Sequence, residues 1–466
     1  MKDFNKTYFF SGIGGSGMLP LALILKSCGA KVFGSDRAHD KGESKEKFTV
    51  LSEFGVSLVP QDGKGVTEEI DSLVISSAVE KTVPDVQAAL DKNIPILKRA
   101  ELLAEIFHTA ETGIGIAGTS GKSTVTGMIA TIFDSQNLNP TVMNGGRVKN
   151  LEGDHKARSG SCLLGENKIF ISEMDESDGS IDLFTPDIAV LNNIAVDHKT
   201  LDELKAHFTS FLKRSKRGCI INLEDLYSVE LLPELTDKTI LTYGIERSDA
   251  DLSASNLQYF SDKTTFEING HAVSLNVPGR HNVLNALAAI AASCLYGLTL
   301  ENAVRGVELF SGIKRRLERL GEAGGVTYYD DFAHNPDKIA ASLSSLRKFE
   351  GRLIVMFQAH GFAPLRMMGG EIIEAFKENF TSSDLLLMPE VYYAGGTVDR
   401  SVTARHIIDR AKQEGVNAHY FEDREKLASF LLETAVPGDR VVIMGARDDT
   451  LTDFCMKLMQ NQSQAA

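Results

Sequence analysis

Short apolar runs alternate along the chain with longer stretches in which apolar residues recur every three or four positions. The runs at residues 8–10 and 112–117 are typical of buried strands, and a glycine-rich loop follows each of them. Beyond the first loop, helical spacing brings Met18, Leu21 and Leu25 onto one face. Strands that alternate with amphipathic helices predict an α/β fold built on parallel sheets.

The order of these elements predicts three domains. Residues 1–110 hold the first strand, loop and helix, and we expect a Rossmann-like domain there. Residues 111–313 repeat this order and then alternate apolar and polar positions over 251–279, which predicts a central α/β domain with a small antiparallel subsheet. The runs VTYYDD, RLIVMF, DLLLMP and RVVIMGA predict a second Rossmann-like domain over 314–466. GIKRRLERLGEAGG predicts a hinge before it, and NQSQAA predicts a disordered C-terminus.

Charge, cysteine content and the lengths of apolar runs indicate which partners and which cellular compartment to expect. The chain has 466 residues, with 49 Lys and Arg against 63 Asp and Glu, and a net charge of -14 disfavours a nucleic acid partner. Five widely spaced cysteines without a C-x-x-C pair indicate reduced thiols and a cytoplasmic enzyme. The N-terminus lacks the apolar core of a signal peptide, and no apolar run is long enough to predict a membrane helix.

The first glycine-rich loop, Gly12-Ile13-Gly14-Gly15-Ser16-Gly17, follows a strand, and Asp36 ends the next strand. This is the G-x-G-x-x-G pattern with a downstream acidic residue that is typical of dinucleotide sites. Its physical basis is the close approach of loop amides and a helix N-terminus to a diphosphate. NAD and a UDP-sugar both satisfy that chemistry, and a turn that packs the strand on the helix is the structural alternative.

The second loop is Gly118-Thr119-Ser120-Gly121-Lys122-Ser123-Thr124, which is shorter than a full P-loop because Ile116 stands where the first glycine is required. Its position between a buried strand and a helix favours a phosphate site over a chance match. The loop amides can surround a phosphate, Lys122 can neutralise its charge, and Ser123 can bind magnesium. This loop makes 111–313 a P-loop ATPase-like domain.

Polar residues follow two further predicted strands. Glu173 ends one strand and is followed by an acidic run, Asp175, Glu176 and Asp178. Asn193, Asp197 and His198 follow another strand. The carboxyl ends of parallel strands face the ligand crevice, so these residues are candidates for magnesium binding, although a solvated loop and a surface histidine are the alternatives. Asn282 and Asn285 begin an apolar helix, where they either read a base edge or belong to a capped core helix.

Taken in order, GTSGKST, SEMDESDGS, NNIAVDH, PGRHNVLNALAA, IKRR and DDFAHNP resemble the Mur ligases of bacterial peptidoglycan synthesis over nearly the whole chain. With GIGGSGM and GSD, the resemblance is closest to the branch of UDP-N-acetylmuramate:L-alanine ligases and the related murein peptide ligases. It implies three domains that bind UDP-N-acetylmuramate, ATP with Mg²⁺, and L-alanine or a short peptide, with no nucleic acid and no membrane partner.

The resemblance also implies roles for individual residues. Lys122 would stabilise the transferred phosphate, Ser123 and Glu173 would hold one magnesium ion, His198 would hold a second, and His334 would position the amine. We expect ATP binding by Gly118, Thr119, Ser120, Gly121, Lys122, Ser123, Thr124, Asn282, Asn285, Arg316 and Asp331. We expect UDP-sugar binding by Gly12, Gly14, Gly15, Ser16, Gly17, Ser35, Asp36, Ser76 and Ser77.

The acceptor motifs depart from the L-alanine ligases. Phe332 stands where they usually carry tyrosine, and Gly361 and Pro364 replace two arginines that help to bind the substrate carboxylate. Arg366 and Arg447 are the candidates to replace them. L-Alanine remains the preferred acceptor and a tripeptide the alternative, while a nicotinamide oxidoreductase, a folate-modifying amide ligase and a non-catalytic Mur-like regulatory subunit are the competing functions.

Overall fold

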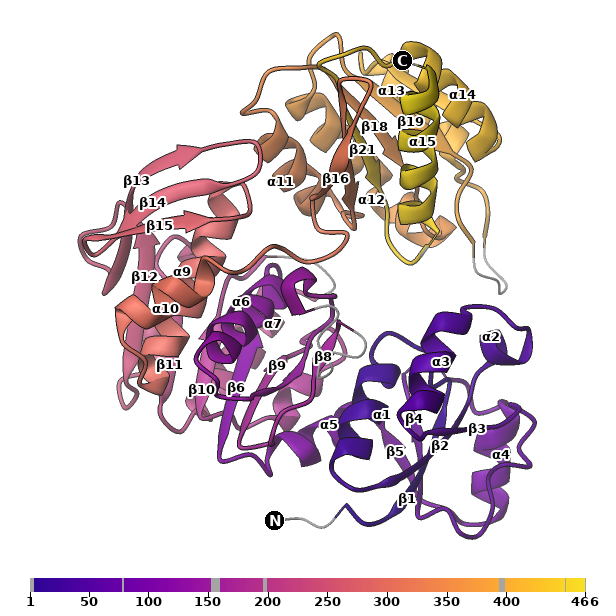
Figure 1. Ribbon diagram of the computed structural model, residues 1–466, viewed down its shortest axis with the longest axis vertical. Coiled ribbons are helices and arrows are strands. Elements are labelled where there is room, and N and C mark those ends of the chain that lie inside the picture. The colour runs from indigo at the N-terminus through magenta and orange to yellow at the C-terminus, as the bar shows by residue number, and fades with distance from the viewer. Residues whose placement is uncertain are drawn as a thin grey trace. The chain divides into compact units, whose positions relative to one another are not determined.

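Three sheets with helices on both faces form the computed structural model, which describes residues 4–77, 79–151, 160–195, 199–393, 399–448 and 450–465 (Figure 1). The chain divides into two compact units. The first comprises Met1–Gln258, Thr264–Val277 and His281–Gly312, and the second comprises Tyr259–Lys263, Pro278–Arg280 and Ile313–Ala466. The predicted α/β class with three domains is confirmed, whereas the boundaries 1–110, 111–313 and 314–466 stay a prediction.

The first sheet has five parallel strands in the order β3-β2-β1-β4-β5. They are β1 (Thr7–Ser11), β2 (Lys31–Ser35), β3 (Ser57–Leu58), β4 (Ser72–Ile75) and β5 (Ile96–Lys98). Buried residues of α1 (Met18–Ser27), α3 (Lys45–Glu53) and α5 (Arg99–Phe107) pack on one face, and α4 (Pro84–Asp91) packs on the other. The short α2 (Arg37–Asp40) follows β2. Strand order reverses between β1 and β4, so the loops after these strands open the crevice where such sheets bind ligands.

The second sheet contains ten strands in the order β15-β14-β13-β12-β11-β10-β6-β9-β7-β8. They are β6 (Thr112–Ala117), β7 (Thr141–Met143), β8 (Cys162–Leu163), β9 (Ile169–Glu173), β10 (Ile188–Leu191), β11 (Gly218–Asn222), β12 (Ile240–Ile245), β13 (Leu252–Tyr259), β14 (Thr264–Ile268) and β15 (His271–Leu275). The main helices are α6 (Lys122–Ser135), α7 (Leu201–Lys213), α9 (Arg280–Tyr296) and α10 (Leu300–Val307). Shorter turns are α8 (Leu226–Val229), η1 (Lys149–Leu151), η2 (Ser180–Leu183) and η3 (Leu232–Glu234).

The stretch predicted as a small subsheet extends this second sheet. Strands β14 and β15 are antiparallel, as expected, but β13 pairs in parallel with β12 and so joins them to the larger sheet. The sheet places the carboxyl ends of β6, β9 and β10 side by side, because β6 pairs with both neighbours in parallel register.

The third sheet has the order β16-β17-β21-β18-β19-β20, and only β16 is antiparallel to its neighbour among these paired strands. The strands are β16 (Glu318–Ala323), β17 (Val326–Asp331), β18 (Leu353–Phe357), β19 (Leu385–Pro389), β20 (Ala418–Phe421) and β21 (Arg440–Met444). Helices α11 (Pro336–Leu346), α12 (Phe362–Asn379) and α13 (Ala404–Gln413) pack on one face. Helices α14 (Arg424–Thr434) and α15 (Leu451–Ala465) pack on the other.

The predicted hinge stays a prediction, and the predicted tail is wrong. The division between the two compact units falls at Gly312 and Ile313, inside the stretch predicted as a hinge. Later in that stretch Gly324 and Gly325, with φ of 56° and 75°, form a tight turn that pairs β16 with β17. The predicted disordered tail belongs to α15, whose buried Leu451, Cys455 and Leu458 recur at helical spacing. In the described residues, no helix has the length and apolar character needed to cross a membrane.

Candidate active site

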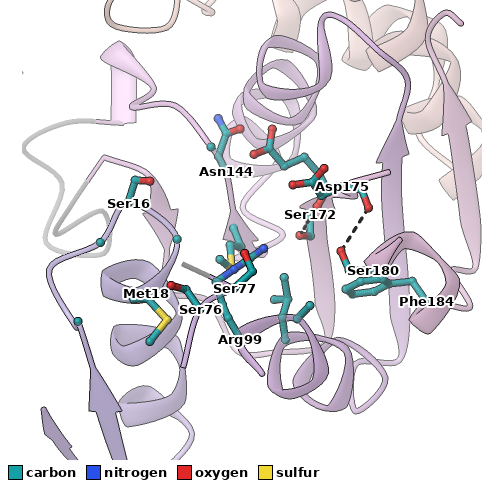
Figure 2. A pocket seen from close by; sticks show the side chains of 18 residues that line it. Ser16, Met18, Ser76, Ser77, Arg99, Asn144, Ser172, Asp175, Ser180 and Phe184 are labelled. Carbon is teal, nitrogen blue, oxygen red and sulfur yellow. Dashed lines mark hydrogen bonds between the residues drawn. The ribbon is translucent and has the colours of Figure 1, made fainter. Parts of the chain in front are cut away.

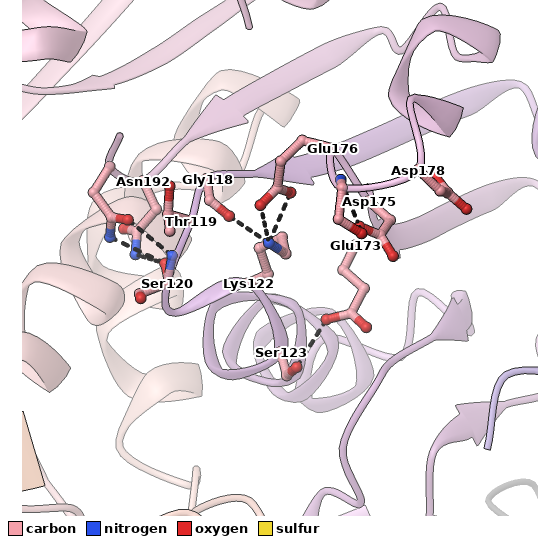
Figure 3. Close-up of polar contacts among 12 residues, drawn as sticks. Gly118, Thr119, Ser120, Lys122, Ser123, Glu173, Asp175, Glu176, Asp178 and Asn192 are labelled. Carbon is pink, nitrogen blue, oxygen red and sulfur yellow. Dashed lines mark hydrogen bonds and ion pairs between the residues drawn. The ribbon is translucent and has the colours of Figure 1, made fainter. Parts of the chain in front are cut away.

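The shortened phosphate loop joins the end of β6 to the start of α6, and Figure 3 shows its contacts. Gly118 and Gly121 have φ of 130° and 85°, a region that other residues rarely adopt. A Cβ atom on Gly121 would lie 2.3 Å from Asn192 Nδ2 and 2.5 Å from Asn285 Oδ1. Backbone conformation and lack of space therefore both require glycine at position 121.

Lys122 is held inside the loop by a carboxylate. Its Nζ donates to the Gly118 carbonyl oxygen at 2.5 Å and to the two Glu176 carboxylate oxygens at 2.9 and 3.1 Å. The side chains of Lys122 and Glu176 are only 19% and 8% exposed, so each charge has lost much of its contact with water and is stabilised by the other. Glu176 belongs to the acidic run after Glu173, but its local sequence does not indicate a contact with this lysine. A phosphate that binds Lys122 must compete with Glu176.

The residues after β10 fix the backbone of the loop. Asn193 accepts from the Ser120 amide through Oδ1 at 2.9 Å and donates to the Ser120 carbonyl oxygen through Nδ2 at 3.0 Å. Asn192 donates to the same carbonyl oxygen at 2.9 Å, and the Ala195 amide donates to the Thr119 hydroxyl at 2.9 Å. The loop is therefore preorganised by NNIA. Asp197 and His198, which follow it, lie outside the described residues, so the predicted metal role of His198 stays a prediction.

Side-chain oxygen atoms that could bind a metal ion lie close together where β9 ends beside α6. The Ser123 hydroxyl donates to Glu173 Oε2 at 2.8 Å. Asn144 is 2% exposed and donates to the Ser123 carbonyl oxygen at 3.1 Å, while its Oδ1 finds no hydrogen-bond partner in the part of the chain that the structure describes. A Cβ on Gly145 would lie 2.0 Å from Glu173 Oε1, so glycine there makes room for the carboxylate.

These donors suit a hard cation. Magnesium takes hydroxyl, carboxylate and amide oxygens and keeps several waters, so a site needs few protein ligands. The described residues contain no group of three or more His, Cys, Asp and Glu side chains that could hold a metal. Ser123 and Glu173 nevertheless fit Mg²⁺, and Asn144 Oδ1, which has no hydrogen-bond partner among the described residues, could serve as a third ligand that its sequence context did not suggest.

A cavity of about 350 Å³ connects this region with the first glycine-rich loop (Figure 2). Gly12, Gly15, Ser16, Gly17, Ser76 and Ser77 from the first sheet region, and Asn144, Ser172, Glu173 and Asp175 from the second, are among its lining residues. Because these loops belong to one compact unit, one ligand can touch both.

Arg99, the first residue of α5, also lines this cavity. A Cβ atom on Gly17 would lie 3.1 Å from Arg99 Cδ, so the side chain rests against the glycine loop. Asp175 lines the same cavity. Burial alone would raise the pKa of Asp175, but hydrogen bonds from Ser177 and the charges of Lys122 and Arg99 outweigh this effect and lower it. Arg99 was not among the predicted site residues, although its position directly after β5 was a usable signal.

The first glycine-rich loop offers only part of its backbone to a ligand. The Gly14 amide donates to Asp36 Oδ2 at 2.9 Å, and Asp36 Oδ1 caps α2 by accepting from the Ala38 amide at 2.8 Å. Among the residues that the structure describes, the Ser16 and Gly17 amides have no hydrogen-bond partner, and both residues line the cavity. These two amides are therefore the ones available to a diphosphate.

Ser35 and Asp36 lie differently with respect to possible ligands. Ser35 is fully buried, and its hydroxyl donates to Asp85 at 2.5 Å. Asp36 lines a second cavity of about 260 Å³ together with Gly12, Gln61 and other residues. The Ser35 carbonyl oxygen accepts from the Gly12 and Ile13 amides at 2.9 and 3.0 Å. The UDP-sugar roles predicted for Ser35 and Asp36 stay predictions.

The two asparagines at the start of α9 are Asn282 and Asn285, and Asn285 lies next to Gly121 of the phosphate loop. Asn285 is buried, accepts from Asn192 Nδ2 at 2.9 Å and donates to Asn282 Oδ1 at 3.3 Å. Asn282 is less buried than Asn285 and therefore the better placed of the two to contact a base. Adenine recognition by these residues stays a prediction.

Arg316, Asp331 and His334 belong to the second compact unit. Asp331 is buried and accepts from Ser342 Oγ at 2.5 Å and from the Leu317 amide at 3.1 Å, and burial raises its pKa. The Arg316 guanidinium lies 5.7 Å from the centroid of the Phe332 ring. Their predicted contacts with ATP stay predictions.

His334 lies beside a second histidine. Its Nδ1 donates to the Phe332 carbonyl oxygen at 2.9 Å, and its ring centroid is 5.1 Å from that of His360. Burial lowers the pKa of His334 to about 4, with a smaller effect from Lys338. Burial, followed by the charge of Arg447, lowers the pKa of His360 to about 4. Both rings are therefore neutral near pH 7.

Family models match in each part of the chain. Residues 7–110 match the model described as Mur ligase family, catalytic domain. Residues 116–293 match the Mur ligase middle domain, and residues 315–447 match the model described as Mur ligase, glutamate ligase domain.

Similar curated proteins extend over nearly the whole chain. The UDP-N-acetylmuramate--L-alanine ligase of Geotalea daltonii is 35% identical over 449 residues, which cover 94% of each chain. The ligase of the same name from Agrobacterium fabrum is 33% identical over 460 residues, covering 95% of this chain and 94% of the relative. That of Bdellovibrio bacteriovorus is 34% identical, with 96% and 97% covered.

Solved structures share the fold. A UDP-N-acetylmuramate-alanine ligase from Thermotoga maritima superposes with a TM-score of 0.80 at 23% identity, covering 99% of this chain and 100% of its own. A murein peptide ligase from Psychrobacter arcticus gives a TM-score of 0.71 at 21% identity, with 98% and 99% covered.

Proposed function

The chain belongs to the Mur ligase family, and we propose that it is an ATP-dependent ligase that joins the carboxylate of UDP-N-acetylmuramate to the amine of L-alanine. The names of the curated relatives support this substrate pair. ATP is the energy source in this family, and Mg²⁺ is generally required. A cytoplasmic location and the lack of a nucleic acid partner remain predictions from composition.

The cavity between the two glycine-containing loops carries the proposal. The free amides of Ser16 and Gly17 and the Arg99 guanidinium can bind a diphosphate at one end. Glu173 and Asn144 line the same cavity and lie beside Ser123 of the phosphate loop. A nucleotide sugar with a carboxylate therefore fits along the cavity, with that carboxylate directed toward the phosphate loop.

The chemistry follows from the low reactivity of a carboxylate toward an amine in water. ATP first transfers its terminal phosphoryl group to the carboxylate and gives ADP and an acyl phosphate. The amine then attacks the acyl carbon, and the C–O bond to phosphate breaks, which releases inorganic phosphate and a proton from the amine. When bound, Mg²⁺ neutralises phosphate charge, and Ser123 and Glu173 would hold it.

Lys122 supplies a fixed positive charge for the transferred phosphoryl group. In the structure this charge is paired with Glu176, which keeps the side chain extended along the loop. We propose that a bound phosphate replaces Glu176 as the partner of Lys122. Between turnovers, Glu176 would hold the Lys122 ammonium group at the phosphate site. Asn192 and Asn193 keep the loop backbone in its phosphate-binding form meanwhile.

A tripeptide is the second candidate acceptor. Gly361 and Pro364 lack the charge and bulk of arginine, and Phe332 stands where the L-alanine ligases usually carry tyrosine. A nicotinamide oxidoreductase is less well supported, because it leaves the phosphate loop without a role. The intact set of Lys122, Ser123 and Glu173 argues against a non-catalytic subunit.

A competition experiment tests the proposal. UDP-N-acetylmuramate, ATP and Mg²⁺ are incubated with the protein and with equal concentrations of L-alanine and L-Ala-D-Glu-meso-diaminopimelate. The product is then identified by its mass in a mass spectrometer. We expect the L-alanine adduct. Exclusive formation of the tripeptide adduct would replace the first proposal with the second, and no adduct with either acceptor would support the regulatory subunit.

A further inference from the structure

Three loops leave adjacent strands of the third sheet at the same level. Asp331 of β17 pairs with Met444 of β21, which in turn pairs with Phe357 of β18. Each strand ends there, so the following loops start side by side at the carboxyl edge of the sheet. This edge is where open α/β sheets bind their ligands.

A histidine or an arginine lies three residues beyond the end of each of these three strands. Counting three residues onward from Asp331, Met444 and Phe357 gives His334, Arg447 and His360. A Cβ atom on Gly445 would lie 2.7 Å from the Gln358 carbonyl oxygen, which shows how closely the β21 and β18 loops approach.

The two histidines add hydrogen-bonding groups without charge. His334 Nδ1 carries a proton, because it donates to the Phe332 carbonyl oxygen at 2.9 Å. The neutral ring therefore keeps an acceptor lone pair on Nε2. The neighbouring His360 ring is neutral near pH 7 as well, since burial and the charge of Arg447 lower its pKa to about 4.

Arg447 differs from two other arginines of the second compact unit. Arg366 pairs with Asp399 at 2.6 Å, and Arg424 pairs with Asp448. Within the described ranges, Arg447 makes no ion pair or hydrogen bond, and its side chain is exposed. Its backbone has a φ of 61°, which is unusual for a residue other than glycine.

We propose that Arg447 binds the carboxylate of the incoming amino acid or peptide, while His334 Nε2 accepts a hydrogen bond from its amine. A guanidinium matches a carboxylate with two parallel hydrogen bonds. One cation beside one lone pair complements a molecule that carries both a carboxylate and an amine, whereas a phosphate offers no N–H group to the lone pair. The assignment rests on the proposed ligase function and gives the role of the arginines missing at Gly361 and Pro364 to the loop that follows β21.

Steady-state kinetics with L-alanine and L-alaninamide test this assignment in the full chain. Arg447→Gly is the main variant, because glycine adopts a φ of 61° without strain and the side chain is exposed. We expect the KM for L-alanine to rise about 10- to 100-fold, in line with the loss of a charge-assisted hydrogen-bonded pair. The KM values for ATP and UDP-N-acetylmuramate should stay unchanged, and the preference for L-alanine over its amide should largely disappear.

Two further variants define the outcome. Arg447→Lys should give an intermediate KM, because lysine keeps the charge but not the planar pair of donors. Arg366→Ala should match the wild type. An unchanged preference in Arg447→Gly, a loss of preference in Arg366→Ala, or a raised KM for ATP in Arg447→Gly would each overturn the assignment alone. A wild-type protein that ligates neither amine would contradict the proposed function and this assignment together.

Discussion

Replacing Lys122 with alanine should affect both stability and catalysis, for two separable reasons. The substitution leaves the Glu176 carboxylate, whose side chain is 8% exposed, without its cation. Breaking a buried ion pair by removing one partner costs about 3–5 kcal/mol. Because the Lys122 side chain is 19% exposed and water reaches the pair, we expect about 2–3 kcal/mol less unfolding free energy for Lys122→Ala.

Catalysis should fall by much more than stability explains. Lys122 is the cation of the phosphate loop, and a fixed charge of this kind contributes several kcal/mol to transition-state stabilisation. We therefore expect phosphate release with all substrates present to drop by about 10³-fold or more. Urea-induced unfolding and a coupled phosphate assay measure the two effects on the same preparations.

A double variant separates the two effects. Lys122→Ala with Glu176→Ala removes both charges, so we expect it to recover most of the lost stability and none of the activity. Activity of Lys122→Ala within about tenfold of the wild type would refute the phosphate-loop assignment. Equal destabilisation in the single and the double variant would show that Glu176 does not depend on Lys122.

Three further predictions concern other parts of the chain. Gly121→Ala should abolish ATP binding in calorimetry, because the added Cβ would lie 2.3 Å from Asn192 Nδ2; normal ATP affinity would contradict the loop geometry. Arg99→Ala should raise the KM for UDP-N-acetylmuramate by about 10-fold or more but leave the KM for ATP unchanged; equal effects on both would remove Arg99 from the sugar-nucleotide end. His360 should titrate near 4 in NMR. Since this pKa is below the unfolded value of about 6.5, its contribution to stability is complete above pH 6.5 and is lost as the pH falls toward 4; a pKa near 6.5 would contradict its burial.

Periodicity predicted the elements that are buried on both faces. The run TGIGIA became β6 and VTYYDD became β17 with the same bounds, because each run is apolar enough to specify a central strand. Both loops with chemical motifs, around Gly12 and Lys122, lie between a strand and a helix as expected. The tail was predicted wrongly, because its polar residues hid the end of an amphipathic helix, and the hairpin turn between β16 and β17 was not predicted.

The sequence indicated candidate residues where they stand at the end of a strand or the start of a helix. Ser123 and Glu173 are 50 positions apart, and the structure joins these two by a hydrogen bond. The roles of Glu176, Asn144 and Arg99 depend on contacts between elements, such as the short distance from Glu176 to Lys122. The alignment of His334, Arg447 and His360 depends on sheet register, which local sequence does not specify.

In the proposed reaction, ATP activates the carboxylate of UDP-N-acetylmuramate as an acyl phosphate. Substrate labelled with ¹⁸O in that carboxylate reports this step, because breaking the acyl C–O bond transfers one labelled oxygen to phosphate. With ATP, Mg²⁺ and L-alanine, we expect one ¹⁸O atom in each inorganic phosphate released, detected by mass spectrometry, and none transferred by Lys122→Ala. Phosphate released without the label would show that ATP is hydrolysed by water and would contradict the ligase mechanism.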